Sequence, residues 1–201
     1  MKILLLYTPR CGSTSVLKYF EKSKPEYECF NEPWYEWMIE HYHKKKYTYE
    51  ELVSKENVFI KSSYRTFPRP FEKALEDFDK VLILLRKDKE KQLESYILTH
   101  KQEAFLDYSK KRYWVDSITS DEWLYFRELY EESLKGLSDF SSQYKVPTYW
   151  YEDLYFNSFA PLFKELNLDY NQDYYREFLD ISKKYRIEGE DIRNKKVTSL
   201  I

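Results

Sequence analysis

Residues 3–15 read ILLLYTPRCGSTS, and this stretch decides the fold. The run from Ile3 to Tyr7 is continuously apolar and ends at Thr-Pro, which is typical of a central strand covered on both faces. The Ser and Thr residues at 13–15 can then cap a helix whose apolar face follows. That face consists of Val16, Leu17, Tyr19 and Phe20. The chain therefore opens with a strand, a loop and a helix.

The same alternation of strands and helices continues along the rest of the chain. Further strands are predicted at residues 27–30, 57–62, 80–85 and 147–150. Helices are predicted at residues 34–44, 69–75, 88–100, 119–144, 159–166 and 173–184, and the tail 187–201 is polar and poorly patterned. This alternation predicts an α/β fold: a three-layer sandwich with a central parallel sheet of about five strands, in a single domain spanning residues 1–201. The ligand site of such a sheet lies at the carboxyl ends of its strands.

The composition excludes several classes of partner. The 33 Lys and Arg residues are balanced by 35 Asp and Glu residues, which leaves a formal charge of −2 and no polycationic field for nucleic acid or a membrane surface. No apolar run approaches the ~20 residues that a membrane helix needs. The two cysteines, Cys11 and Cys29, are too few for a disulfide framework and lack the spacing of zinc ligands. We therefore expect a metal-free cytoplasmic protein with reduced thiols that binds neither nucleic acid nor membranes.

The loop that follows the first strand has the composition of an anion site. Gly12 allows the backbone to approach a ligand closely, and the N–H groups at the start of the helix point toward that ligand. Arg10 adds a forked cation, and the hydroxyls of residues 13–15 add hydrogen-bond donors. The loop is not a Walker A motif, because it lacks the earlier glycine and the lysine before the hydroxyl residue. A purely structural strand-to-helix turn stays open as an alternative.

A second basic position follows the strand at residues 80–85. Arg86 leaves the sheet at its carboxyl edge, and Asp88 is placed to cap the next helix. Helical spacing puts Gln92, Ser95 and Thr99 on one polar stripe with Asp88. The alternative interpretation is a solvated face with a salt-bridging arginine.

Together these segments resemble the sulfotransferase family, enzymes that transfer a sulfuryl group from 3′-phosphoadenosine 5′-phosphosulfate (PAPS) to an acceptor and release 3′-phosphoadenosine 5′-phosphate (PAP). Residues 7–15 are similar to the family's loop for the 5′-phosphosulfate. Arg86, followed nine residues later by Ser95, is similar to its 3′-phosphate segment, with a spacing closer to the bacterial carbohydrate-type branch. Residues 147–154, PTYWYEDL, resemble the family's Tyr-Glu-Asp-Leu signature.

The resemblance implies a fold like that of the P-loop-containing nucleotide hydrolases, with a PAPS site built from all three segments. It assigns the 3′-phosphate to Arg86 and Ser95, the adenine to the neighbourhood of Tyr151, and the 5′-phosphosulfate to the first loop. The expected contacts in that loop are Arg10, Cys11, Gly12, Ser13, Thr14 and Ser15. Two separated anion sites match a nucleotide that carries phosphates at both its 3′ and 5′ positions. Sulfuryl transfer needs no metal.

Glu32 is the expected catalytic base, because branches of the family without a catalytic histidine are similar in carrying a glutamate after the second strand. Arg10 is expected to stabilise charge on the leaving phosphate, and Lys61 to lean over the transferred group. The alternatives are a helix-start acid for Glu32 and a solvent-exposed lysine for Lys61. The chain departs from the family in two places. It lacks the histidine that phenol-type enzymes carry near the third strand, and the late basic Arg-Lys-Gly loop has no close counterpart.

The acceptor is expected to be a hydroxyl or amine of a carbohydrate or another small molecule, walled by residues 34–42 and 101–118. Two other functions stay open at this stage. A phosphotransferase of the nucleotide-kinase type shares the strand–loop–helix start, and a non-catalytic nucleotide-binding module could use the same loops. The sequence also leaves the oligomeric state open, including a homo-oligomer.

Overall fold

The computed structural model describes residues 1–43, 45–101 and 118–176. Its contacts divide the chain into two compact units, Met1–Glu152 and Asp153–Ile201. The first unit contains the sheet and every residue that the sequence assigns to the candidate site.

The first unit is built on one five-stranded sheet. Its strands are β1 (Lys2–Tyr7), β2 (Glu28–Asn31), β3 (Val58–Ser63), β4 (Lys80–Leu85) and β5 (Thr148–Trp150). They lie in the order β2-β3-β1-β4-β5, and every pair of neighbours is parallel. The predicted parallel sheet of about five strands is therefore confirmed. The register places Tyr7 opposite Ser63 on one side and Leu84 on the other, so the carboxyl ends of the three middle strands lie level.

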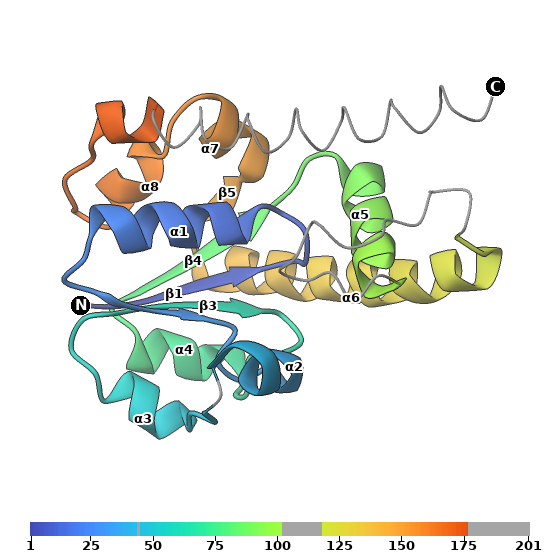
Figure 1. Cartoon of the computed structure of the whole chain (residues 1–201), viewed down its shortest axis with the longest axis horizontal. Helices are drawn as coiled ribbons and strands as arrows, with labels where there is room; N and C mark the ends of the chain where they lie inside the picture. The colour runs from blue at the N-terminus through green and yellow to red at the C-terminus, as the bar shows by residue number, and fades with distance from the viewer. Residues whose placement is uncertain (44, 102–117, 177–201) are drawn as a thin grey trace. The chain divides into compact units, whose positions relative to one another are not determined.

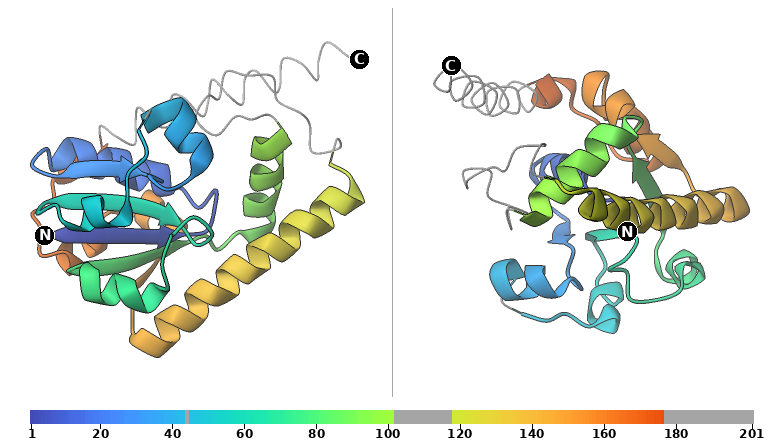
Figure 2. Two further views of the ribbon diagram at one scale, coloured as in Figure 1. Left: turned by 90° about the horizontal axis from the view of Figure 1, so that it is seen from below. Right: turned by 90° about the vertical axis from the view of Figure 1, so that its right-hand side faces the viewer.

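Helices lie on both faces of this sheet (Figure 1). The helices of the first unit are α1 (Ser13–Ser23), α2 (Glu36–Met38) with the π-helical segment η1 (Ile39–His43), α3 (Tyr49–Val53), α4 (Phe71–Asp77), α5 (Lys89–Lys101) and α6 (Ser120–Tyr144). In Figure 1, α1 lies on one side of the sheet while α3 and α4 lie on the other. This arrangement is consistent with a three-layer α/β sandwich. Figure 2 shows α5 beyond the end of the sheet toward which the strands point, beside the first part of α6, whereas the later part of α6 runs back along the sheet, where Leu137 and Phe140 join its core.

The burial of β1 explains why its sequence has no polar alternation. Ile3, Leu4, Leu5 and Leu6 are fully buried, because successive side chains point to opposite faces and both faces are covered. Leu4 and Leu6 belong to a core that also contains side chains of α3, α4 and α6. On the opposite face, Phe59 of β3 stacks on Phe20 of α1 with ring centroids 4.3 Å apart. The apolar run is therefore the sequence signature of a strand buried on both sides.

Local capping signals position several helices as the sequence predicts. Thr119 and Glu122 form a complete capping box at the start of α6. Asp88 accepts a hydrogen bond from the backbone N–H of Lys91 at 3.1 Å, which caps α5. By contrast, α1 begins directly after Gly12, so Ser13, Thr14 and Ser15 lie inside its first turn. The expectation that a hydroxyl side chain caps this helix is therefore wrong.

Two elements differ from the sequence-based expectation. The aromatic segment predicted as one helix at residues 34–44 is a three-residue α-helix followed by the π-helical segment η1. The short helix α3 was not predicted, although Thr48 and Glu51 form a capping box at its start. Both elements are too short for a helical hydrophobic period to be recognised.

Helix α7 (Tyr151–Phe156) begins at the end of the first unit and continues into the second, which also contains α8 (Ala160–Glu165) and a helical segment at 172–176. The buried Tyr175 anchors the second unit, because its hydroxyl contacts the carbonyls of Leu154 at 2.7 Å and Tyr155 at 2.6 Å. The helix predicted at 159–166 is confirmed. The one predicted at 173–184 is confirmed as far as residue 176, and the tail 187–201 lies outside the described residues. None of the helices in the described part of the chain combines the length and apolar character that crossing a membrane requires.

Candidate functional site

The sheet contains a topological switch point between β1 and β4. After β1 the chain passes through α1 to β2 on one side of the sheet, whereas after β4 it passes through α5 and α6 to β5 on the other side. The loops that leave these two neighbouring strands therefore run in opposite directions. In open parallel sheets, ligands bind in the crevice that such diverging loops create. The two loops carry Arg10 and Arg86, the two arginines singled out from the sequence.

The loop after β1 has two residues in the left-handed region of backbone conformation. Arg10 has φ 66° and Gly12 has φ 82°. The buried Gln92 of α5 holds this loop, because its amide nitrogen donates to the Thr8 hydroxyl at 2.8 Å and to the Pro9 carbonyl at 2.6 Å. The Tyr130 hydroxyl of α6 in turn donates to the Gln92 amide oxygen at 3.0 Å. Helices far away in the sequence thus hold the conformation of the loop after β1.

The structure brings the two arginines and Ser95 together. The Arg10 side chain donates from Nε to the Ser95 hydroxyl at 3.0 Å. Arg86 donates from a terminal guanidinium nitrogen to the Arg10 carbonyl at 3.4 Å. The sequence assigned Arg10 to one phosphate site and Ser95 with Arg86 to another. In the structure the two groups are in direct contact, so the two expected anion sites are adjacent.

Gly12 has a close neighbour that the sequence does not indicate, the ring of Tyr151. A Cβ atom placed on Gly12 would fall on ring carbons of Tyr151, so the position where a side chain would begin is already occupied by this ring. The guanidinium carbon of Arg86 lies 5.8 Å from the centroid of the same ring. Tyr151 is itself buried. The tyrosine assigned to the adenine site is therefore packed between the first loop and Arg86.

Glu152 organises the loop after β4. Its carboxylate accepts hydrogen bonds from the backbone N–H groups of Lys87 at 2.9 Å and Asp88 at 3.2 Å. One of its oxygens lies 3.7 Å from Nε of Arg86, and about a fifth of each side chain is exposed (22% for Arg86 and 21% for Glu152). Nε of Arg86 is buried and has no hydrogen-bond partner among the described residues. The loop therefore contains a cation with unused donor capacity beside an acidic neighbour.

Lys61 is a buried lysine, contrary to the alternative of a strand-end residue in solvent. Only 3% of the residue is exposed. Its ammonium donates to the Asn31 side-chain oxygen at 2.6 Å and to the Thr14 hydroxyl at 3.1 Å, and lies 4.8 Å from the centroid of the Tyr7 ring. Burial lowers the pKa of Lys61 below its ordinary value, while the nearby Glu32 acts in the opposite direction. Lys61 thus connects the first turn of α1 to the end of β2.

Glu32 lies directly after β2, with φ 49° and its backbone N–H donating to the Lys61 carbonyl at 2.7 Å. Its carboxylate accepts hydrogen bonds from two hydroxyls, one from Tyr7 and one from Thr66, the latter at 3.2 Å. Burial raises the pKa of Glu32 above its ordinary value, and Lys61 opposes that effect. A carboxyl group of this kind can accept a proton near neutral pH more readily than an exposed glutamate.

The remaining loop residues contribute to the site in different ways. Cys11 is fully buried, and burial raises the pKa of its thiol to about 12, so it is a neutral side chain in the physiological range. Ser13 is buried in the first turn of α1, and the backbone N–H of Ser15 donates to the Gly12 carbonyl at 3.0 Å. Within the described ranges, no three His, Cys, Asp or Glu side chains are placed to hold a metal ion.

Several residues that shape this site received no individual role from the sequence, although Tyr7 and Glu152 lie within its motifs. Tyr7, Asn31, Thr66 and Glu152 all contact a predicted site residue. Tyr7 and Asn31 had a usable signal, because each is the last residue of a strand that ends at the predicted site edge. Thr66 had none, since the loop after β3 carries no motif. The acceptor wall expected at 101–118 falls almost entirely outside the described residues.

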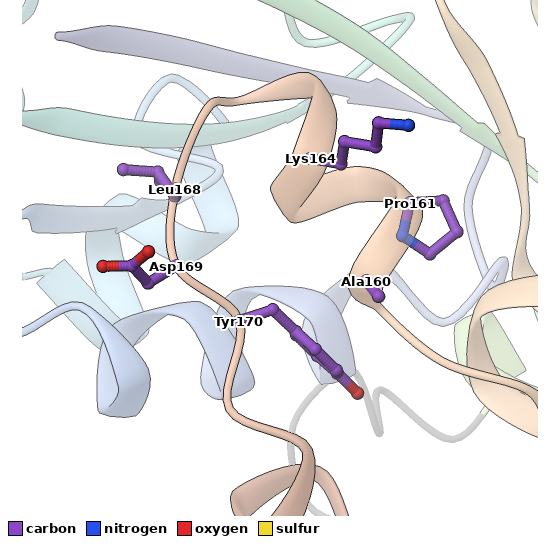
Figure 3. Close-up of a pocket in the computed structure, with 6 residues that line it drawn as sticks. All are labelled: Ala160, Pro161, Lys164, Leu168, Asp169 and Tyr170. Carbon is purple, nitrogen blue, oxygen red and sulfur yellow. The ribbon is translucent and has the colours of Figure 1, made fainter.

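A separate pocket of about 650 Å³ lies in the second unit (Figure 3). It is lined by Ala160, Pro161, Lys164, Leu168, Asp169 and Tyr170. None of the site residues predicted from the sequence lies on it.

Comparison with models of known protein families finds no match for this chain, and comparison with curated proteins finds no significant match.

Proposed function

We propose that this protein is a PAPS-dependent sulfotransferase with a P-loop-like nucleotide site between β1 and β4. The observation that carries the proposal is the convergence of Arg10, Arg86 and Ser95 at this switch point, beside the N-terminus of α1. A bisphosphorylated nucleotide needs two adjacent anion-binding groups, and guanidinium groups provide strong, forked donors for phosphate oxygens. The sequence resemblance identifies PAPS as the sulfuryl donor, because the three segments that carry the resemblance meet at this switch point.

The residues present fit such a donor substrate. The first amides of α1 follow Gly12, which has no side chain to cap them, and they lie at the positive end of an 11-residue helix. Nε of Arg86 is a buried donor that makes no hydrogen bond within the described chain, although the Glu152 carboxylate lies 3.7 Å away. Ser95 adds a hydroxyl beside the Arg10 guanidinium. These groups match the acceptor oxygens of phosphates in both charge and hydrogen-bonding role.

The chemistry assigned to the site is transfer of a sulfuryl group to a hydroxyl or amine acceptor. Glu32 takes the acceptor proton, the acceptor oxygen or nitrogen forms a bond to sulfur, and the bond between sulfur and the 5′-phosphate oxygen breaks. The electron pair stays on the phosphate, which leaves as PAP. Arg10, Lys61 and the α1 amides stabilise the charge that develops there. Lys61 can serve this role because its ammonium already contacts Thr14 in the first turn of α1.

The proposal is tested by incubating the full chain with PAPS and a panel of sugar and phenol acceptors while PAP release is measured. We expect PAP formation that depends on one class of acceptor. In the control, Glu32→Gln should still bind PAP but release it at least about 100-fold more slowly from PAPS. A chain that binds ATP with Mg²⁺ and shows no affinity for PAP would instead be a phosphotransferase.

A further inference from the structure

Glu32 and Lys61 are linked through a third side chain, that of Tyr7, which begins the loop segment at residues 7–15 but received no role of its own from the sequence. Tyr7 is the last residue of β1 and only 3% of it is exposed. The Lys61 ammonium lies 4.8 Å from the centroid of its ring, and its hydroxyl donates to the Glu32 carboxylate. The three residues come from three adjacent strands or strand ends, in the order β2-β3-β1. One phenol therefore contacts both the cation and the carboxylate of the proposed chemistry.

The carboxylate is held from a second direction as well. Thr66, in the loop after β3, donates to the other oxygen of Glu32 at 3.2 Å and is itself within 2.9 Å of the Ser63 hydroxyl. The Tyr7 and Thr66 hydroxyls thus contact different oxygens of the carboxylate, and Ser63 at the end of β3 contributes a further hydrogen bond to Glu32. A carboxylate that accepts these hydrogen bonds still keeps a lone pair that can accept a proton.

We propose that Tyr7 is a positioning residue for the Glu32 carboxylate, with Thr66 as its second anchor. Tyr7 donates a hydrogen bond to the ionised form of Glu32, and its ring holds the Lys61 ammonium at a separate contact. The inference rests on the proposed function for the role of Glu32 as a base. The contacts that carry it do not depend on which donor or acceptor binds.

These hydrogen bonds should lower the pKa of Glu32. A hydrogen bond to the charged form of a carboxyl lowers its pKa. The hydroxyls of Thr66 and Ser63 act on Glu32 in this direction, against the increase that burial causes. The Tyr7 hydroxyl, which also donates to this carboxylate, should act in the same direction.

In the described part of the chain, the titratable groups that face Glu32 come from two strands, one helix and the loop after β2. They are Tyr7 from β1, Tyr35 after β2, Lys61 from β3 and Tyr96 from α5. Burial raises the pKa of Tyr35 and raises that of Tyr96 to about 12, so both stay neutral at physiological pH.

The test is a ¹³C NMR titration of the glutamate side-chain carboxyls in the full chain, with the Glu32 signal assigned from Glu32→Gln. Tyr7→Phe keeps the ring that contacts Lys61 and removes only the hydroxyl. We expect it to raise the pKa of Glu32 by about 1, as the loss of a hydrogen bond to a charged group implies. Thr66→Val should change the same pKa in the same direction.

Tyr49→Phe is the matched control, because Tyr49 is also a buried tyrosine and donates to the carboxylate of Asp77 at 2.9 Å. It should leave the Glu32 titration unchanged. A Glu32 pKa that does not rise in Tyr7→Phe overturns the inference. Should that variant not fold, an unchanged pKa in Thr66→Val overturns it in the same way.

The sulfotransferase proposal and the positioning role of Tyr7 can be refuted independently of each other. If PAPS is not turned over but Tyr7→Phe still raises the pKa of Glu32, the positioning role stands and the sulfotransferase proposal falls. If PAPS is turned over and the titration is the same in Tyr7→Phe as in the wild type, only the positioning role falls.

Discussion

At the scale of single residues, a buried lysine, Lys61, lies near a partly buried glutamate, Glu32, of opposite charge. Burial raises the pKa of Glu32 and lowers that of Lys61, so each is held closer to neutrality than on a surface. Each also attracts the other, which partly offsets the cost of burying both charges. These opposed effects suit a base that must accept a proton and a cation that must stay near a leaving anion.

The raised pKa of Glu32 predicts a specific dependence of stability on pH. Between the ordinary value of 4.5 and the folded pKa, the native state binds this proton more tightly than the unfolded chain does. The contribution of Glu32 to the free energy of unfolding therefore decreases as pH rises through that interval. Glu32→Gln removes the effect, so its stability relative to the wild type should increase from pH 4.5 to pH 8. Urea denaturation at several pH values measures this difference, and a difference that decreases with pH would contradict the assignment.

The close packing of Gly12 against Tyr151 predicts a second effect on stability. Gly12→Ala should cost about 3 kcal/mol of unfolding free energy, because a Cβ there meets the Tyr151 ring and φ is 82°. In a Tyr151→Ala background the same change should cost only about 1 kcal/mol, the part due to backbone conformation. Chemical denaturation of the four proteins measures the coupling. Equal costs in both backgrounds would mean that Tyr151 does not pack against Gly12.

The same residue shows where local sequence reasoning ends. A glycine before a helix predicts a backbone conformation that other residues avoid, and the positive φ of Gly12 agrees with that. The local sequence does not show whether the group that comes close to Gly12 is a ligand or a side chain of the protein. Tyr151 lies 139 positions further along the chain, and only the folded sheet brings it there.

At the scale of elements, the predictions succeeded where a signal is local and repeated. The buried runs of β1 and β4 and the capping box of α6 are all visible in a few consecutive residues. The short helix α3 and the π-helical segment η1 have too few residues for a period to emerge, and their conformation depends on tertiary packing.

The capping box of α6 gives a quantitative expectation. Thr119→Ala should lower the free energy of unfolding by about 1 kcal/mol, because the Thr119 hydroxyl accepts the Glu122 backbone N–H at 3.2 Å. Ser120→Ala, one residue further along the same helix, is the control and should have a much smaller effect. Urea denaturation measures the free energy of unfolding of both variants. Equal losses in the two would show that the capping hydrogen bond does not stabilise the chain.

The hydrogen bonds that Glu152 accepts from the loop between β4 and α5 lead to a further prediction. Glu152→Gln should destabilise the chain by about 1–2 kcal/mol, because its carboxylate accepts from the N–H groups of Lys87 and Asp88. Hydrogen exchange at these two amides should become faster. Glu132→Gln is the matched control, since Glu132 forms only an exposed ion pair with Arg65 at 2.9 Å. Unchanged protection at Lys87 and Asp88 would contradict the organising role of Glu152.

At the scale of the molecule, the sheet was predictable but its strand order was not. Alternating strands and helices predict parallel pairing and a site at the carboxyl ends. The order β2-β3-β1-β4-β5 is what puts the switch point between β1 and β4, and this order arises from long-range packing. That order also explains why the two arginines meet. The sequence placed Arg10 and Arg86 at separate phosphate sites, whereas the fold makes them neighbours.

The central claim is that these neighbouring arginines bind a nucleotide phosphorylated at both its 3′ and 5′ positions. Calorimetric titration of the full chain with PAP, adenosine 5′-monophosphate and adenosine 3′-monophosphate tests it most directly. We predict that PAP binds about 10–100-fold more tightly than either monophosphate, as one charge-assisted contact implies. Arg86→Met should remove the preference over the 5′-monophosphate and Arg10→Met the preference over the 3′-monophosphate, while the exposed Arg65→Met should change neither. Equal affinities for all three nucleotides in the wild-type chain would contradict the claim.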